Sequence, residues 1–327
     1  MKLPLAKILD ECEVVNDIFE KRTLTMSNSA FNTFSCPIKG LLSYAFKLRP
    51  IGASSLAMDY GTSIHAGLAE MMKGKSLEEA KRAFYQEADK FQIDTYDDPR
   101  RCTARGTDTL EQWQQWIATL NYPIKAITLR ERPAVEVCVV KTIAKEEVSF
   151  LGEMMFKWLG IIDAVVEYKG QYWILDHKTT SMLGDRFLDD KIRSNQFLGY
   201  YYLMKDIVKK ELNVDIAGCL IEAISTGTKD VNFRLYEIPF SPWQLDEWLV
   251  NTRRKLLDIV HTVSNIVFNP EYEVVAELES CVTKYGRCPF FNVCSVNPRL
   301  RDEMLRIEFM KHEHNAREAN DFVIEEE

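Results

Sequence analysis

Over the first 132 residues, apolar positions recur at three- and four-residue intervals, which is the period of an amphipathic helix. We expect a helical lead-in over residues 1–35. Ser76 is a favourable N-cap, so a helix should begin directly after it. The expected helices of this region then cover residues 36–50, 55–73 and 77–91 and the surroundings of Trp113 and Trp116.

The pattern changes at about residue 133, where short runs rich in β-branched and aromatic residues begin. The runs predict strands over residues 134–140, 148–155, 159–168, 172–178, 216–225 and 233–240. Helices are expected over residues 195–212 and 241–265. Strands interleaved with helices in this order indicate an α/β core built on a mixed or antiparallel sheet.

The patterning divides the chain into three regions. Residues 1–132 form an N-terminal helical region, residues 133–265 form the α/β core, and residues 266–327 form a C-terminal segment with three cysteines and a charged helix. We expect the first and third regions to pack together as one unit. The acidic end, from Glu325 to Glu327, should be frayed.

Composition narrows the class of protein. A net charge of −8 excludes a surface coated in positive potential, so contact with nucleic acid has to come from local basic patches and bound metal cations. No stretch reaches the roughly 18 uninterrupted apolar residues of a membrane span. The N-terminus also meets charged residues early, unlike the apolar part of a secretory signal. We therefore expect a cytoplasmic protein without a membrane partner.

A hairpin in the core carries the most informative chemistry. Its two apolar runs are separated by Lys169-Gly170, which suits a two-residue turn because glycine accepts positive φ. Such a turn sets Tyr168 opposite Gln171 and, further along the strands, Asp163 opposite Asp176. The two carboxylates would then project from the same face of the sheet, with Cβ atoms about 4.5 to 5.5 Å apart.

Like charges at that separation need a compensating charge. Mg²⁺ or Mn²⁺ suits two carboxylates, because both ions prefer hard oxygen ligands. Lys178, two residues past Asp176, points to the same face by strand alternation. These charges could alternatively be solvent-facing positions on an ordinary hairpin. The apolar residues on both sides of Asp163 and Asp176 favour covered strands, in which three charges need a reason.

The hairpin resembles the RecB-type branch of the PD-(D/E)XK nuclease superfamily. The Gly-x-x-Asp of that branch is present as Gly160 to Asp163, and its Asp-x-Lys-Thr as Asp176 to Thr179. Its Gln-x-x-x-Tyr motif is matched on the following helix by Gln196 and Tyr200. The resemblance implies a restriction-endonuclease-like core, with a mixed central sheet flanked by helices.

The same resemblance assigns roles to individual residues. It implies that Asp163 and Asp176 bind Mg²⁺ or Mn²⁺, that Lys178 orients the attacking water, and that Gln196 and Tyr200 position the lysine or the DNA backbone. His65 matches the helical histidine of a Gly-x-x-x-His motif, a further metal ligand. Glu136 resembles the acidic residue of the preceding strand. Without that context, His65 reads as a surface or core histidine and Glu136 as an exposed strand position. His177 alternates to the opposite face, and we leave it out of the chemistry.

The cysteines form a second candidate site. Cys281, Cys288 and Cys294 lie within fourteen residues, and Cys36-Pro37 repeats the Cys288-Pro289 pair. Four thiolates suit a [4Fe-4S] cluster, with Zn²⁺ and unliganded buried thiols as alternatives. The layout resembles the iron–sulfur exonucleases of the AddB and CRISPR-adaptation kind, although the spacing from Cys281 to Cys288 departs from theirs. The centre would be chiefly structural. The four remaining cysteines are expected in the core.

These features predict a metal-dependent DNA exonuclease acting on single-stranded or end-processed DNA. Lys191 and Arg193 are the favoured phosphate contacts, because they lie between Lys178 and Gln196. The resemblance implies a role in recombination, repair or phage DNA metabolism in a bacterial or phage-infected cell, with a helicase or recombination protein as a candidate partner. The alternative is a non-catalytic, cluster-stabilised DNA-binding or complex-forming module that keeps the nuclease fold.

Overall fold

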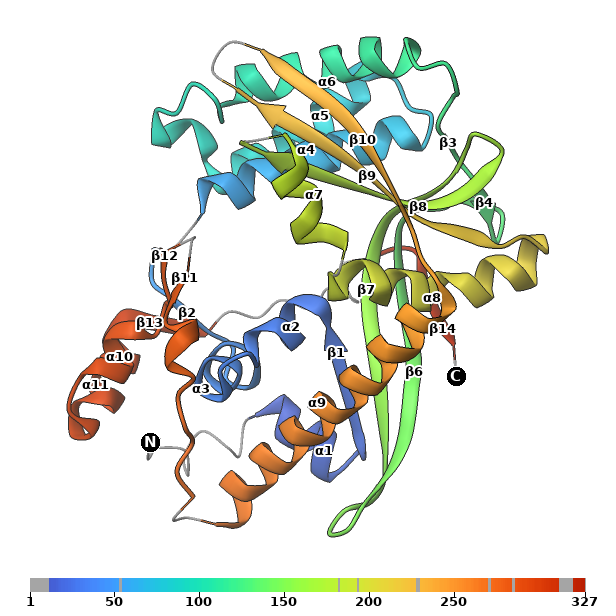
Figure 1. The fold of residues 1–327 in the computed structure, drawn as a ribbon. Coiled ribbons are helices and arrows are strands. Elements are labelled where there is room, and N and C mark those ends of the chain that lie inside the picture. The colour runs from blue at the N-terminus through green and yellow to red at the C-terminus, as the bar shows by residue number, and fades with distance from the viewer. Residues whose placement is uncertain are drawn as a thin grey trace.

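A computed structural model describes residues 12–52, 55–181, 183–192, 194–227, 230–269, 272–283, 286–311 and 320–326. Its centre is an eight-stranded mixed sheet with the order β10-β9-β8-β7-β6-β14, and both β1 and β3 also pair with β7 (Figure 1). The strands of this sheet are β1 (Thr23–Ser27), β3 (Lys125–Ala126), β6 (Val135–Val148), β7 (Gly152–Tyr168), β8 (Gln171–Thr180), β9 (Ile216–Thr226), β10 (Val231–Pro239) and β14 (Val323–Glu326). The expected α/β core on a mixed sheet is therefore confirmed.

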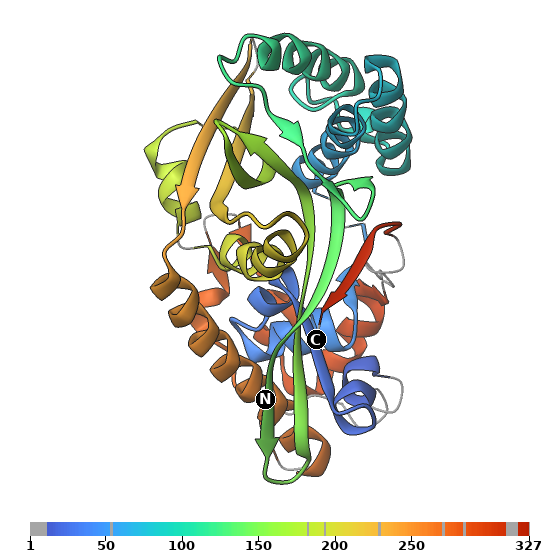
Figure 2. The same ribbon diagram turned by 90° about the vertical axis from the view of Figure 1, so that its right-hand side faces the viewer.

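Helices cover both sides of the sheet. Figure 2 shows the α4–α6 layer on one side and α8 and α9 on the other. The longer helices are α4 (Leu56–Met72), α5 (Leu77–Phe91), α6 (Thr103–Ala118), α7 (Asp185–Ile192), α8 (Asn195–Leu212) and α9 (Pro242–Phe268). Shorter ones are α1 (Glu13–Phe19), α2 (Asn28–Thr33), α3 (Pro37–Gly40) with a π-helical continuation (Leu41–Ala45), α10 (Phe291–Ser295), α11 (Arg301–Glu308) and 3₁₀ turns at Ile93–Tyr96, Leu278–Ser280 and Pro298–Leu300. None of the helices in the described part of the chain is both long enough and apolar enough to cross a membrane.

Two-stranded pairs complete the fold. They join β4 (Thr128–Leu129) to β5 (Arg132–Pro133), β11 (Val282–Thr283) to β12 (Gly286–Arg287), and β2 (Leu48–Pro50) to β13 (Phe309–Lys311). The last pair joins a strand of the N-terminal region to a strand of the C-terminal region.

Local signals predicted several helices well. Ser76 caps α5 through a capping box, in which its hydroxyl accepts from the Glu79 amide and the Glu79 carboxylate accepts from the Ser76 amide. The helix expected over residues 195–212 is α8 with those bounds. These are segments where an N-cap and a regular apolar stripe agree.

Three local expectations were wrong. The helical lead-in contains β1, which pairs in parallel with β7. The strand expected over 148–155 is divided, because Val148 ends β6 and a turn follows, and its residues 152–155 begin the long strand β7, which also contains the expected strand 159–168. At the acidic end, Glu325 and Glu326 are not frayed, because β14 pairs in parallel with β6 and its Ile324 is fully buried, while Glu327 lies outside the described residues. For β1 and β14, a partner strand far away in sequence decides the local structure.

The β7–β8 hairpin has the predicted turn and register. Lys169 and Gly170 both have positive φ, at 53° and 71°, and Tyr168 pairs with Gln171. Antiparallel pairing continues as far as Ala164 and Leu175, so the ladder ends one pair before the expected Asp163–Asp176 pair. Beyond that point β8 continues in parallel alongside β9.

Gly160 allows α8 to approach β7 closely. A Cβ at this position would lie 2.7 Å from Leu203 Cδ1 and 3.0 Å from Tyr200 Cε1. Both of those side chains belong to the buried face of α8. The glycine therefore sets the distance between β7 and the helix that carries Gln196 and Tyr200.

We expect Gly160→Ala to lower the free energy of unfolding by about 1–3 kcal/mol, because the added methyl group overpacks this contact. Urea unfolding followed by circular dichroism measures the change. Lys157→Ala, at a half-buried position of the same strand, is the control and should change stability by less than about 0.5 kcal/mol. Equal effects of the two substitutions would contradict the close approach.

Candidate active site

The first carboxylate of the site lies where β7 changes its partner strand. On one edge of β7, β1 pairs with residues 155–159 and β8 pairs with residues 164–168. Asp163 lies in the stretch between these two pairings. Its Oδ2 accepts a hydrogen bond of 2.8 Å from the backbone amide of His177. A side chain thus connects β7 to β8 just beyond the last pair of the antiparallel ladder.

The second carboxylate is fully buried on the α8 side of the sheet. Asp176 has no exposed surface, and Lys178 Nζ lies 2.7 Å from each of its carboxylate oxygens. Lys178 and Gln196, the latter at 3.2 Å, both donate hydrogen bonds to Oδ1. Gln196 Nε2 also donates to the Tyr200 hydroxyl at 3.0 Å. The structure therefore gathers Asp176, Lys178, Gln196 and Tyr200.

The two carboxylates differ in their electrostatic surroundings. Burial alone would raise the pKa of Asp163, but the charges of His65, Lys178 and His177 outweigh it and hold the pKa below its ordinary value. Burial raises the pKa of Asp176, although the ammonium of Lys178 partly offsets it. Burial would lower the pKa of Lys178, but the charge of Asp176 more than compensates, so the lysine stays protonated.

His65 and Glu136 border Asp163. His65, on α4, places Nδ1 3.4 Å from Asp163 Oδ2. Glu136 stands across from Asp163 in the β6–β7 register, between the pairs Val135–Ala164 and Val137–Ile162, and has a φ of 52°. Burial, and then the charge of Asp163, raise the pKa of Glu136 to about 7. Every residue expected at the metal site is therefore close to Asp163 or Asp176.

Sequence reasoning missed a polar network on the opposite face of β8. His177 Nδ1 contacts Glu222 Oε2 closely, and the indole Nε1 of Trp113 donates to Glu222 Oε1 at 2.7 Å. The His177 ring lies edge-on to the ring of His65, with 5.9 Å between the ring centroids. A signal was present, because Glu222 is a lone acid in an otherwise apolar strand with a buried pattern of residues.

The side chains fit a divalent cation by their donor types. Among the described residues, no three His, Cys, Asp or Glu side chains are already arranged to hold a metal ion. Asp176 Oδ2 is buried, and its close contact in the described structure is the Lys178 ammonium at 2.7 Å, a cation that accompanies the carboxylate without a second hydrogen bond. Two carboxylates and a neighbouring imidazole are suitable ligands for Mg²⁺ or Mn²⁺.

The four cysteines of the second candidate site interact with one another. Burial, and then the thiols of Cys288, Cys36 and Cys281, raise the pKa of Cys294 to about 11. The Cys288 amide donates to the Cys281 carbonyl at 2.8 Å, and the Glu277 amide donates to Cys36 Sγ at 3.5 Å. All four thiols are free of disulfides. Residues from both ends of the chain therefore meet here.

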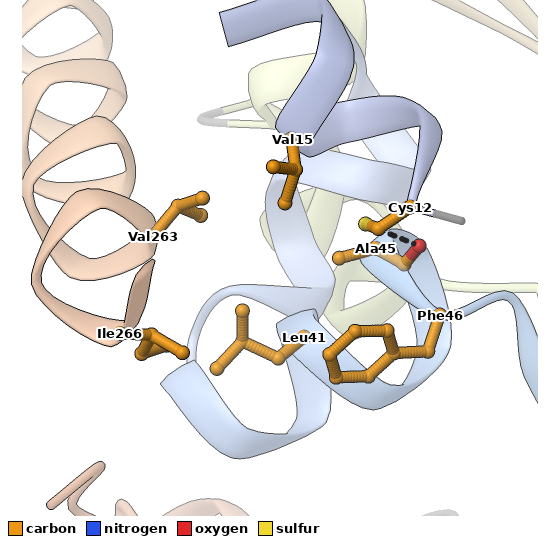
Figure 3. Close-up of a pocket in the computed structure, with 7 residues that line it drawn as sticks. All are labelled: Cys12, Val15, Leu41, Ala45, Phe46, Val263 and Ile266. Carbon is orange, nitrogen blue, oxygen red and sulfur yellow. Dashed lines mark hydrogen bonds between the residues drawn. The ribbon is translucent and has the colours of Figure 1, made fainter. Parts of the chain in front are cut away.

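A fifth cysteine, Cys12, lies in an apolar part of the core and does not belong to this group of four. An apolar pocket near α1 is lined by Cys12, Val15, Leu41, Ala45, Phe46, Val263 and Ile266 (Figure 3). The Cys12 thiol donates to the Ala45 carbonyl at 3.0 Å. The pocket brings no charged side chain to its wall, so it is a packing feature and not a candidate catalytic site.

The predicted phosphate contacts are only partly placed. Lys191 lies at the end of α7, with Nζ 5.5 Å from the centroid of the Phe187 ring. Arg193 lies outside the described residues. The assignment of Lys191 and Arg193 as phosphate contacts therefore stays a prediction.

Comparison with known proteins gave a family match. The family model described as the PD-(D/E)XK nuclease superfamily matches residues 25–295, a segment that contains both candidate sites. Among solved structures, a "Putative exonuclease" from Eubacterium rectale is 14% identical over 98% of this chain and 99% of its own, with a TM-score of 0.45. SSO0001 is 12% identical over 76% of this chain and 83% of its own, with a TM-score of 0.24. No curated protein matches.

Removal of the Lys178 charge tests how far Asp176 depends on it. In the presence of EDTA, we expect Lys178→Met to lower the free energy of unfolding by about 3–5 kcal/mol, because a buried carboxylate loses its cation. Lys209→Met is the control. Its ion pair with Asp215, at 3.0 Å, is exposed and should contribute less than about 1 kcal/mol. Similar losses in both variants, measured by chemical denaturation, would show that Asp176 does not need Lys178.

Proposed function

This chain belongs to the PD-(D/E)XK nuclease superfamily, and from that premise we propose that it is a metal-dependent deoxyribonuclease that hydrolyses phosphodiester bonds. The observation that carries the proposal is the fully buried Asp176 carboxylate paired with Lys178, beside Asp163 at the parting of β7 and β8. Placing a buried acid, a second acid and a lysine within neighbouring strands of a covered sheet costs free energy, and such groups are common at functional sites.

Asp163 and Asp176 are the residues that would hold Mg²⁺ or Mn²⁺, with His65 as a further ligand. Such a cation, when bound, lowers the pKa of water and neutralises charge on the phosphate. Asp163 is suited to this role because its pKa is held below the ordinary value and it stays ionised. Glu136 completes the acidic side of the site and is assigned to the metal or to its waters.

Lys178 is assigned to the attacking water. Its ammonium group is held by Asp176, at 2.7 Å, and remains protonated, so it can donate a hydrogen bond and stabilise negative charge that develops on the phosphate. Gln196 donates to both Asp176 and Tyr200. These bonds fix the Asp176 carboxylate from the α8 side, which supports a positioning role for Gln196 and Tyr200.

The substrate and setting follow from the RecB-type character of the motifs. We assign the protein as an exonuclease on single-stranded or end-processed DNA, in recombination, repair or phage DNA metabolism. Lys191 and Arg193 are the proposed phosphate contacts. The proposed location is the cytoplasm, with a helicase or a recombination protein as the proposed partner.

End-labelled single- and double-stranded DNA tests the nuclease proposal. With Mg²⁺ or Mn²⁺, the parent should release labelled nucleotides, and Asp163→Ala and Lys178→Ala should each reduce the rate by on the order of 10²-fold or more. Lys209→Ala, which removes an exposed lysine of α8, should leave the rate unchanged.

The alternative is a DNA-binding or complex-forming module without turnover. It would hold if the parent bound labelled DNA but cleaved it with neither metal. Equal cleavage by the parent, Asp163→Ala and Lys178→Ala would instead assign the activity to a contaminant and sink the enzyme proposal.

We further propose that Cys36, Cys281, Cys288 and Cys294 bind a [4Fe-4S] cluster, with Zn²⁺ as the rival ligand. Support comes from the mutual influence of their thiols on the pKa of Cys294 and from thiolate-only ligation, which suits a cluster. The role is structural, because the centre would join residues from both ends of the chain.

Protein purified without oxygen should be brown and carry about four iron and four sulfide per chain. Cys281→Ala should lose the colour and unfold at a lower temperature, because metal binding and folding are coupled. Cys102→Ala, outside the cysteine group, is the control and should keep both. If the parent protein is colourless and contains stoichiometric zinc, the ligand is Zn²⁺ and not the cluster. If the protein is folded without metal, the four thiols are unliganded.

A further inference from the structure

A buried carboxylate–imidazole pair lies on the α4 side of the sheet, across β8 from Lys178. Glu222 of β9 is 1% exposed and His177 of β8 is 2% exposed. The two residues are register partners in the parallel β8–β9 ladder. Trp113 of α6 donates its indole N–H to the remaining Glu222 oxygen at 2.7 Å. Three elements therefore converge on one carboxylate inside the core.

Stability gives this pair no clear reason to exist. Moving a carboxylate out of water is costly, and replacing a buried ion pair with well-packed apolar residues is often neutral or stabilising. The chain neighbours of Glu222 are apolar, because Leu220, Ile221, Ala223 and Ile224 are all fully buried. Because stability does not account for this buried charge, we look for its role in the adjacent candidate active site.

The pair reaches the active site by two routes. Through the ring of His177, it touches His65, whose ring lies edge-on at 5.9 Å between centroids. Through the backbone of His177, it touches Asp163, whose Oδ2 accepts the His177 amide at 2.8 Å and lies 3.4 Å from His65 Nδ1. Both residues assigned to the histidine-facing side of the metal site therefore rest on His177.

We propose that Glu222, His177 and Trp113 are positioning residues, which hold His65 and Asp163 in the arrangement that binds the divalent cation. Glu222 fixes the orientation of the His177 ring, Trp113 fixes Glu222, and the His177 ring and amide fix His65 and Asp163. Carboxylates that orient histidines around a metal site are worth on the order of 10–100-fold in metal affinity elsewhere. The inference rests on the proposed function in one respect, namely that the site binds a divalent cation.

Mn²⁺ binding to the full chain, measured by electron paramagnetic resonance of the free ion, tests the proposal without relying on turnover. Glu222→Gln removes the negative charge at nearly constant volume and should weaken Mn²⁺ binding about tenfold or more. Glu237→Gln is the matched control on the adjacent strand β10. Glu237 is exposed and pairs with Lys169 at 2.6 Å. The Glu237→Gln variant should therefore bind Mn²⁺ as the parent does.

A milder variant keeps the test open if Glu222→Gln does not fold. Trp113→Phe keeps an aromatic ring at this position and removes the N–H donor to Glu222 together with part of the buried indole. It should weaken Mn²⁺ binding several-fold in protein whose circular dichroism is that of the parent. Parent-like binding in a folded Trp113→Phe variant, with Glu222→Gln unfolded, would overturn the proposal.

Combination with His65→Ala separates positioning from general support of the fold. If Glu222 acts through His65, Glu222→Gln should weaken Mn²⁺ binding much less in the His65→Ala background than in the parent. Effects that multiply independently would overturn the route through His65 and leave only the contact of the His177 amide with Asp163. A lower melting temperature with an unchanged Mn²⁺ dissociation constant would overturn the proposal, because that result assigns Glu222 to stability alone.

The two proposals fail in different ways. If the parent binds Mn²⁺ but does not cleave DNA, the nuclease proposal is wrong, and the Mn²⁺ affinities of the variants still decide the positioning role. A parent that cleaves DNA while Glu222→Gln binds Mn²⁺ equally well removes the positioning role alone. A parent that does not bind Mn²⁺ overturns both.

Discussion

The site depends on the parting of β7 and β8 after the Ala164–Leu175 pair. Up to that pair the two strands satisfy each other's backbone groups. Beyond it β8 follows β9, and the His177 amide turns to a side chain, the carboxylate of Asp163. Because buried amides need partners, this bond holds the Asp163 carboxylate at the junction. The acid is thus positioned by the topology of the sheet.

The site contains residues from the helical layers on both sides of the sheet. Alternation along β8 sends Asp176 and Lys178 toward Gln196 of α8, and sends His177 toward His65 of α4. The α8 side is made of an ammonium and an amide that satisfy one carboxylate. The α4 side is made of imidazoles supported by Glu222. A change in either layer can therefore reach the chemistry without touching the other.

Local sequence features predicted the parts of the fold that local forces decide. The Lys169-Gly170 turn, the register that follows from it and the Ser76 cap were all found, because the signal and the structure are a few residues apart. The strand β1, the strand β14 and the Glu222–His177 pair were missed, because their partners lie far away in sequence. The proximity of His65 and Glu136 to Asp163 came from family resemblance, since no local rule places them there.

The pairing of β2 with β13 has a consequence for the order in which the molecule assembles. Pro50 pairs with Phe309, so the two strands meet only after a very long loop has closed. Contacts of such high sequence separation form late, once the chain between them is ordered. The hairpin, by contrast, closes over two residues. The β7–β8 turn can therefore form without either end of the chain, whereas the β2–β13 pair requires both ends to meet.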